Sequence, residues 1–357
     1  MKGNVFIILI LALSFGSCVK DKPISNNSRP AINEHPKMFI ANEGAYGNGN
    51  ASLSYLDLST NEIFNNIYAS QNEGKALGDV FQSIKGDRNN LYLIINNSNC
   101  IVVIDKRNFK QKFIIPIEQP RQMAFLNDTL ALVSSMYRKK LYVVNLSSGN
   151  IDKTIELPYA NTEGLLNAEN KIFICPWDVN CSYVYVFDIN SQNISDSIFI
   201  GKNAPGYLAL DKDKNLWVTS GNPTKGVAAA ITKLNPKTKQ ILQSFSFNGN
   251  TEIIKPCLNP SKDTIYFLAV NYNATNNDYN GLYRMNIEAN TAPSEAFVKS
   301  KALQYFWSVG INPYNGNIYL GDPRGWIQSG QVIEFSPSGQ EINRFNVGIG
   351  PGDFYFD

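Results

Sequence analysis

The chain has 357 residues, of which 43% are hydrophobic and 12% aromatic, and this composition excludes an intrinsically disordered protein. The formal net charge is only +2, from 32 basic and 30 acidic residues, and no basic stretch occurs, so nucleic acid is not an expected partner. Asn is abundant between the apolar segments. Because Asn favours turns, the composition indicates an all-β fold with many turns.

The N-terminus resembles a bacterial lipoprotein signal peptide. Residues 5–13 (VFIILILAL) form an apolar run that is too short to cross a bilayer and has the length of a signal-peptide core. It leads into residues 15–18 (FGSC), which resemble a lipobox with Phe15 at the position where Leu is usual. We expect residues 1–17 to be removed and Cys18 to be lipidated. The alternative is an ordinary secretory signal in which Cys18 is incidental.

Residues 18–36 follow as a polar segment rich in Asn, Ser and Pro, which predicts a flexible tether. It contains His35, the single histidine of the chain. The Lys-Asp pair soon after Cys18 resembles the surface-export signals of Bacteroidetes lipoproteins. The expected location is therefore the outer membrane, with the protein held by a lipid anchor and exposed on the cell surface.

One sequence unit recurs seven times between residue 37 and the C-terminus. Each unit contains an apolar strand that ends in a small polar residue before a polar turn: Asp57, Asp105, Asn145, Asp188, Asn235, Asn286 and Ser336. Successive endings lie 40 to 51 residues apart, which is the period of a four-stranded propeller blade. Because these side chains recur at the same step of every unit, we interpret them as turn caps rather than as catalytic or metal-binding groups.

The two ends of the repeat region complement each other. Residues 38–42 (MFIAN) have the pattern of a second strand with no first strand before it, and residues 351–356 (PGDFYF) have the pattern of an innermost strand. We predict that the C-terminal strand completes the first blade and removes the exposed edges. The predicted fold is one all-β domain over residues 37–357, a seven-bladed β-propeller with four-stranded antiparallel blades.

One face of such a ring collects the loops between second and third strands and the loops that enter the innermost strands. Many of these loops contain Trp or Tyr, which give large, rigid contact areas. Packing between blades is the alternative role for such aromatic residues, above all for Trp307. The residues predicted to bind a ligand on this face are Tyr46, Asp79, Phe81, Tyr137, Arg138, Trp177, Asp178, Tyr207, Tyr272, Trp307, Arg324 and Trp326.

The repeat, with its Pro-led inner strand and its Asp-ending strand, resembles the YncE-like seven-bladed propellers. With the lipobox and residues 38–44 (MFIANEG) and 308–313 (SVGINP), it is most similar to propeller lipoproteins of Bacteroidetes. Some of these, the BtuG type, capture cobalamin and cobinamide for a TonB-dependent outer-membrane transporter. The resemblance implies a corrinoid ligand, held by shape and hydrogen bonds, and a transporter partner. A glycan-binding or protein-binding scaffold is the alternative.

Other chemistry has little support in the sequence. Cys175 and Cys181 flank one loop of the fourth repeat, where a disulfide would brace the loop, and the sequence leaves their oxidation state open. No CxxC pair or Cys/His cluster indicates a metal site, and the acidic residues of the predicted face are scattered. We therefore expect no catalytic residues, no metal and no cofactor, with a propeller lyase or lactonase as the weaker alternative.

Overall fold

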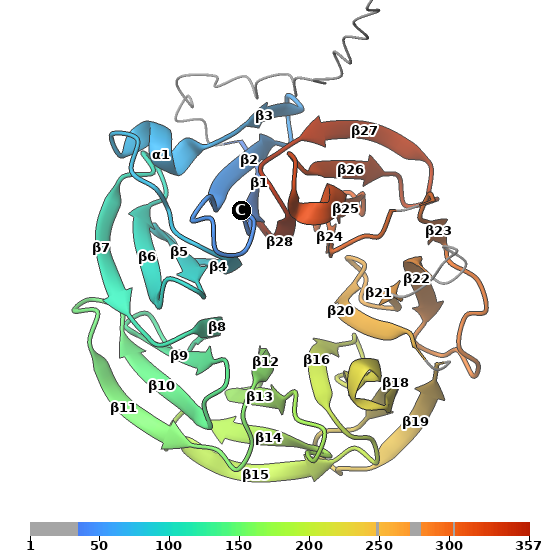
Figure 1. Cartoon of the computed structure of the whole chain (residues 1–357). Helices are drawn as coiled ribbons and strands as arrows, with labels where there is room; N and C mark the ends of the chain where they lie inside the picture. Colours follow the sequence, from blue (N-terminus) through green and yellow to red (C-terminus); the bar gives the residue numbers. More distant parts are fainter. Residues whose placement is uncertain (1–34, 248–249, 272–279, 303) are drawn as a thin grey trace, which may run out of the picture.

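A computed structural model describes residues 35–247, 250–271, 280–302 and 304–357. The predicted signal peptide, Cys18, nearly all of the predicted tether and Tyr272 lie outside these residues. Within the described residues, seven four-stranded antiparallel sheets surround a common axis as the blades of a ring (Figure 1). The predicted seven-bladed propeller is confirmed.

The strands of each blade follow one another from the axis outward. Blade 1 contains β28 (Pro351–Phe356), β1 (Lys37–Asn42), β2 (Ser52–Asp57) and β3 (Glu62–Phe64). Blade 2 contains β4 (Phe81–Gly86), β5 (Asn90–Ile95), β6 (Cys100–Asp105) and β7 (Gln111–Pro116). Blade 3 contains β8 (Pro120–Phe125), β9 (Leu130–Ser135), β10 (Lys140–Asn145) and β11 (Ile151–Glu156). Blade 4 contains β12 (Thr162–Ala168), β13 (Lys171–Pro176), β14 (Tyr183–Asp188) and β15 (Asn193–Phe199).

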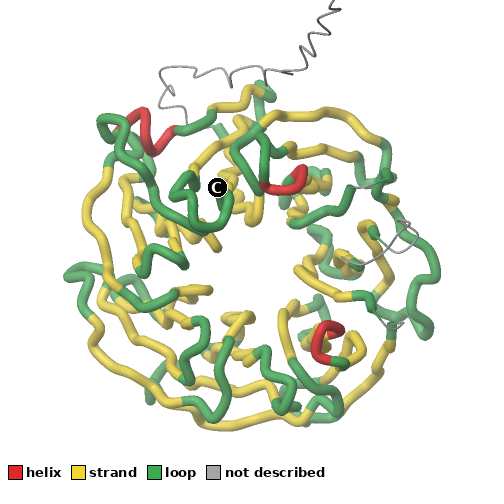
Figure 2. Tube along the Cα trace, viewed as in Figure 1, coloured by secondary structure: helices red, strands yellow, loops and turns green. Residues whose placement is uncertain are grey.

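The remaining blades have the same order. Blade 5 contains β16 (Pro205–Leu210), β17 (Leu216–Asn222), β18 (Val227–Leu234) and β19 (Ile241–Ser246). Blade 6 contains β20 (Glu252–Leu258), β21 (Thr264–Val270), β22 (Gly281–Asn286) and β23 (Val298–Lys299). Blade 7 contains β24 (Ser308–Ile311), β25 (Ile318–Asp322), β26 (Gln331–Phe335) and β27 (Glu341–Asn346). Short helical segments are α1 (Ile67–Gln71), η1 (Pro223–Lys225) and η2 (Arg324–Trp326), shown in red in Figure 2.

The burial of each strand follows from its position in the blade. The second strands are buried almost throughout, as in β9, β17 and β25, because each blade packs between two neighbouring blades. The outermost strands, such as β11 and β27, expose most of their residues. A strand that is covered on both faces needs apolar residues at successive positions. The apolar runs that mark the repeats in the sequence are therefore the blade interiors.

The predicted turn caps are present. Asp57 Oδ1 accepts hydrogen bonds from the backbone N–H groups of Ser59 and Thr60, at 2.9 and 3.1 Å. Asn145 and Asn235 hold the equivalent turns of blades 3 and 5 in the same way. These side chains satisfy turn backbone that the sheet cannot reach, which explains their recurrence once per blade.

The ring is closed by the pairing of β28 with β1, as predicted. Phe39 lies opposite Tyr355 and Ile40 opposite Phe354. Asp353 of the same strand accepts a hydrogen bond from the backbone N–H of Ile84 in β4, at 3.0 Å. The two chain ends of the domain thus share one blade, and that blade contacts the innermost strands of both neighbours.

Bulges in the innermost strands determine what faces the axis. The pairing register of these strands with their neighbours shifts at one or two residues in β4, β8, β12, β16, β20 and β28, and β24 has no such shift. The residues at the first five shifts include Gln82, Arg121, Glu163, Tyr207 and Lys255. A bulge re-aims its side chain and frees backbone from the ladder. We call these five residues the polar girdle.

In the described part of the chain, no helix has the length and apolar character needed to cross a membrane.

The closing blade generates a stability prediction. Phe39 is fully buried, and its ring lies within 6.3 Å of Tyr355, Tyr55 and Phe109 rings. Phe39→Ala should lower the free energy of unfolding by about 3–5 kcal/mol, because it leaves a cavity at the closure. Denaturant unfolding followed by circular dichroism measures this. Ile342→Ala, at a half-exposed outer position, should cost less than about 1 kcal/mol; equal losses would contradict the prediction.

Candidate functional site

A cavity of about 640 Å³ opens on the axis of the ring. It lies at the face where the innermost strands begin, since Gln82 and Arg121 are the second residues of β4 and β8. The five girdle residues form part of its lining. Loops contribute Glu43, Tyr46, Trp177 and Trp307, while Asn222 ends β17 and Trp326 ends η2. Seven blades thus converge on one concave site, which is the usual form of a small-molecule site.

Two tryptophans of blade 7 form one side of the cavity, which we call the aromatic wall. Trp307 precedes β24, and Trp326 ends η2; their ring centroids are 5.2 Å apart at an interplanar angle of 77°. Tyr305 packs against Trp326 at 5.7 Å. Trp177 lines another part of the cavity, and its indole N–H donates to the carbonyl of Gly221 at 2.8 Å. The polar edges of Trp177 and Trp307 are bonded within the protein, so each offers its carbon surface to the cavity.

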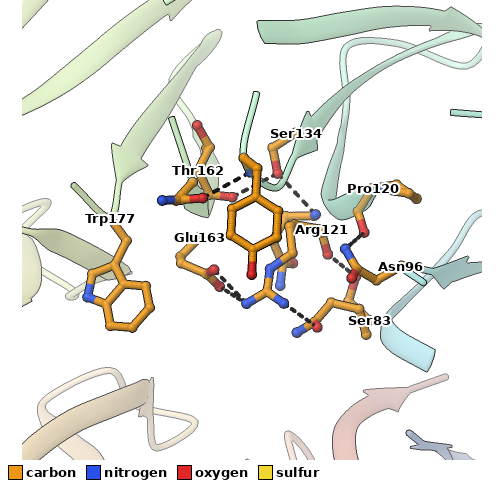
Figure 3. A network of polar contacts seen from close by, with 12 residues as sticks. Ser83, Asn96, Pro120, Arg121, Ser134, Thr162, Glu163 and Trp177 are labelled. Atoms are coloured by element: carbon orange, nitrogen blue, oxygen red, sulfur yellow. Dashed lines mark hydrogen bonds and ion pairs between the residues drawn. The ribbon is translucent and has the colours of Figure 1, made fainter. Parts of the chain in front are cut away.

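An ion pair lies at the base of the cavity. The Arg121 guanidinium donates to both oxygens of Glu163, at 2.5 and 2.6 Å, and to Oε1 of Gln82 at 2.6 Å (Figure 3). Burial disfavours the charge of Arg121, but the Glu163 carboxylate outweighs it and raises the Arg121 pKa. Both side chains are largely covered, with 15% and 3% exposed. A bidentate pair of this kind is rigid, and Arg121 Nε remains buried without a hydrogen-bond partner in the described part of the chain.

Hydrogen bonds to the backbone hold this part of the girdle in place. Ser83 Oγ donates to the Arg121 carbonyl at 2.7 Å, and Asn96 Nδ2 donates to the Pro120 carbonyl at 3.0 Å (Figure 3). Ser134 Oγ donates to the Thr162 carbonyl at 3.1 Å. Each bond joins one blade to the next blade. The bulged strands are thus fixed from blade to blade where the sheet ladder is interrupted.

The charged residues Glu43 and Lys255 connect the girdle to the aromatic wall. Trp307 Nε1 donates to Glu43 Oε1 at 2.7 Å, and the Lys255 ammonium lies 5.4 Å from the Trp307 ring centroid. Lys255 also donates to the Gly352 carbonyl. Burial raises the pKa of Glu43, against the opposing effects of Lys255 and Trp307, and burial lowers the pKa of Lys255, against the opposing effect of Glu43. The two groups stabilise each other's charge inside the ring.

A smaller cavity of about 200 Å³ lies along the same axis. It shares Gln82, Glu163, Tyr207 and Lys255 with the larger cavity and is lined further by Lys85 and Asp353. The girdle therefore stands between the two cavities. A ligand in the larger cavity meets these side chains as a polar floor.

Five of the predicted ligand-binding residues line the larger cavity: Tyr46, Trp177, Tyr207, Trp307 and Trp326. Tyr46 is 80% exposed at the opening. Asp79 lies beside the site as a support, since its carboxylate accepts from Gly47 N at 2.9 Å and so anchors the loop that contains Tyr46. Phe81, by contrast, is fully buried in the hydrophobic core and does not line the cavity.

The structure places the other predicted residues away from the cavity. Tyr137 is 62% exposed, and Arg138 pairs with Glu118 on the surface. Asp178 caps its own turn through the N–H of Asn180 at 2.9 Å, and Arg324 donates to the Ser329 carbonyl at 3.2 Å. The polar groups of Asp178 and Arg324 are therefore engaged in hydrogen bonds within their own turns. Tyr272 lies outside the described residues.

The sequence analysis missed the girdle residues Gln82, Arg121, Glu163 and Lys255 as ligand-site residues, and it did not single out Glu43 among the scattered acidic residues of the predicted face. A signal existed for three of them: Gln82, Arg121 and Glu163 are each the second residue of an innermost strand that otherwise supplies core residues, whereas Lys255 is the fourth residue of β20. A polar side chain at the same early position in several blades indicates a common direction toward the axis. The Trp and Tyr residues of the loops form the more obvious pattern in the sequence, so the site was predicted from the loops.

The two cysteines of blade 4 are free in the structure rather than joined. Both are buried, and Cys181 Sγ donates to the carbonyl of Tyr183 at 3.3 Å, within its own turn. Burial raises the pKa of the Cys181 thiol to about 11 and also raises that of Cys175. Among the residues that the structure describes, no group of three His, Cys, Asp or Glu side chains is arranged to hold a metal ion.

Fold and cavity together define a seven-bladed β-propeller with a ligand-sized site on its axis. Within that class, the chain belongs to the family described as a domain of unknown function, DUF5074, which matches residues 37–356. No curated protein matches the sequence.

Two solved structures share the fold. A quinoprotein alcohol dehydrogenase-like protein from Bacteroides thetaiotaomicron is 14% identical, with a TM-score of 0.67, over 90% of this chain and 79% of that chain. Hydrazine synthase from Kuenenia stuttgartiensis is 11% identical, with a TM-score of 0.60, over 76% of this chain and 88% of that chain. At these identities the likeness concerns the fold alone.

The ion pair of the girdle generates a second prediction. Glu163→Gln leaves the covered Arg121 guanidinium without its anion, and the free energy of unfolding should fall by about 3 kcal/mol. The double variant Arg121→Met/Glu163→Leu should be more stable than Glu163→Gln, because it removes both charges. Denaturant unfolding of the three proteins tests this. A double variant less stable than Glu163→Gln would contradict this prediction.

Proposed function

We propose that this propeller captures a small molecule in the axial cavity, and that the molecule is a corrinoid such as cobalamin or cobinamide. The observation that carries the proposal is a cavity of about 640 Å³ with an aromatic wall above a closed polar floor. A ligand for this site needs a broad apolar surface and many polar edge groups. A corrinoid is a wide, partly apolar ring bordered by amide side chains.

The charges of the lining favour donor groups on the ligand. Among the described lining residues, Glu43, Glu163 and Glu252 are acidic, while Arg121 and Lys255 are basic, an excess of one carboxylate. Both oxygens of Glu163 already accept from Arg121 Nη2, which neutralises the guanidinium, so we assign the pair to the floor rather than to an anion site. Amide N–H groups at the edge of a corrinoid suit such a surface, and carboxylates do not.

The geometry favours binding over catalysis. Among the lining groups with shifted pKa values, Glu43, Arg121 and Lys255 are each bonded to another protein group. Burial raises the pKa of the fourth, the Tyr207 phenol, well above its usual value. A general acid or base needs a proton position directed at a substrate. These groups instead hold aromatic and polar surfaces in fixed positions, and preorganisation of this kind raises affinity.

The proposal extends to delivery. Lipidation at Cys18 and a tether over residues 18–36 would hold the domain at the outer membrane, exposed on the cell surface, where a TonB-dependent transporter would receive the ligand. The lipobox resemblance supports the anchor, and the family resemblance supports the transporter.

Isothermal titration of residues 25–357 with cobinamide and with cyanocobalamin tests the proposal. We expect micromolar or tighter binding, with a change in the visible spectrum of the corrinoid. Trp177→Ala and Trp326→Ala should each weaken binding roughly tenfold or more, about 1.4 kcal/mol, because each removes a large contact surface.

Tyr314→Ala is the matched control. Tyr314 is 66% exposed in the turn that follows β24, at the end of that strand away from the cavity. It should bind corrinoids like the unchanged protein. Absence of heat and of a spectral change with both corrinoids would contradict the proposal. Binding of a neutral oligosaccharide in the same assay, lost with Trp177→Ala, would then identify a glycan as the ligand.

A further inference from the structure

The aromatic wall is held by a carboxylate from a different blade. Glu43 follows β1 in blade 1, whereas Trp307 and Trp326 belong to blade 7. Trp307 donates to Glu43 Oε1 at 2.7 Å, and Trp326 packs against Trp307 with ring centroids 5.2 Å apart at an interplanar angle of 77°. An indole has a single donor and no acceptor. One buried anion therefore holds the indole edge of Trp307 directly and positions Trp326 through the contact between the two rings.

The closing strand provides the space for this arrangement. A Cβ atom on Gly350 would lie 2.5 Å from Trp326 Nε1, and one on Gly352 would lie 2.3 Å from Glu43 Oε1. Both glycines lie where the chain enters β28. Any side chain at these positions would displace Trp326 or Glu43. The wall and its anchor are thus packed directly on the strand that closes the ring.

Backbone hydrogen bonds connect the same residues to the closure. Glu43 N donates to the Gly350 carbonyl at 2.8 Å, and Gly44 N donates to the Ile349 carbonyl at 2.9 Å. Phe81 N donates to the Glu43 carbonyl at 3.2 Å and so connects blade 2. Glu43 is 9% exposed and contributes both its backbone and its carboxylate to the junction of blades 1 and 7. A change in the wall must therefore act on the junction, and a change in the junction must act on the wall.

We propose that Glu43 is a positioning residue of the binding site, which fixes Trp307 and Trp326 and couples ligand binding to closure of the ring. In this role its carboxylate acts through the indoles that it holds in place. The part that concerns the ligand rests on the proposed function. The positioning of the wall does not, and it can be measured without any ligand.

The ligand-free experiment uses three variants of the protein. Glu43→Gln keeps a hydrogen-bond acceptor, Glu43→Leu removes it, and Glu334→Leu is the matched control. Glu334 is also a buried carboxylate, on β26 of blade 7, and accepts from Tyr319 and Asn343 at 2.8 and 2.7 Å, outside the cavity lining. Both Leu substitutions remove a buried hydrogen-bonded carboxylate, so they separate positioning from a general loss of stability.

The readouts are the indole N–H signals of ¹⁵N-tryptophan-labelled protein and the exchange of the Glu43 and Gly44 amides. The chain has four tryptophans, and Phe substitutions assign their signals. In Glu43→Leu, the Trp307 and Trp326 indole signals should shift, and the amides at positions 43 and 44 should exchange at least tenfold faster. In Glu43→Gln, the indole signals and the amide exchange rates should stay close to those of the unchanged protein. Glu334→Leu should leave both unchanged. Unchanged indole signals and exchange in Glu43→Leu would overturn the proposal.

Titration with cobinamide then tests the coupling. Glu43→Leu should weaken binding at least tenfold, Glu43→Gln by about threefold or less, and Glu334→Leu not at all. Cobinamide should also slow exchange of the 43 and 44 amides in the unchanged protein. Binding that is equal in Glu43→Leu and the unchanged protein would refute the role of Glu43 and leave the proposed function standing. Altered indoles without cobinamide binding to any protein would refute the proposed function and leave the positioning role standing.

Discussion

The pairing of β28 with β1 is the constraint on which the rest of the structure depends. Each blade buries its second strand only because a neighbouring blade covers each face, and the first and last blades obtain that cover only when the ring closes. The paired strands supply Phe39 and Tyr355 to the core between blades 1 and 2. They also supply the backbone on which Glu43 rests. Ring closure therefore sets both the stability of the domain and the geometry of one side of its cavity.

Burial of charge at the axis has a physical explanation in the geometry of the innermost strands. Seven twisted sheets cannot fill the centre of their ring with backbone. Bulges there leave residues unpaired in the ladder and turn their side chains toward the axis. Arg121 donates to both Gln82 and Glu163. Glu43 accepts from the indole N–H of Trp307, and the Lys255 ammonium lies over the ring of the same indole. Polar groups inside a protein need such partners. The floor of the cavity is thus a set of side chains that largely bond one another, with Arg121 Nε as a buried donor that has no partner among the described residues.

The sequence predicted the blades well because their determinants are local. Asp57, Asn145 and their equivalents mark each turn, and the apolar second strands mark each blade interior. Closure was predictable because residues 38–42 and 351–356 each lack a partner in the repeat pattern. The site was predicted in part: Trp177, Trp307 and Trp326 line the cavity, whereas Phe81 is core and Arg138 lies on the surface. Arg121 and Lys255 were not predicted, because their orientation toward the axis depends on a register shift in β8 and β20. That shift is set by pairing with the neighbouring strands.

The direction of β1 also gives the domain a polarity. Its last residue precedes Glu43 at the cavity, while its first residue, Lys37, exchanges backbone hydrogen bonds with Asp357 at the far end of the strand. Six residues of β-strand span about 20 Å, which is the depth of the ring from one face to the other. A domain attached through the residues before Lys37 would therefore be held by the face opposite the cavity, and the cavity would open away from the attachment. Such a domain receives its ligand on the face opposite the point of attachment. To pass that ligand to a partner on the attached side, the domain must reorient.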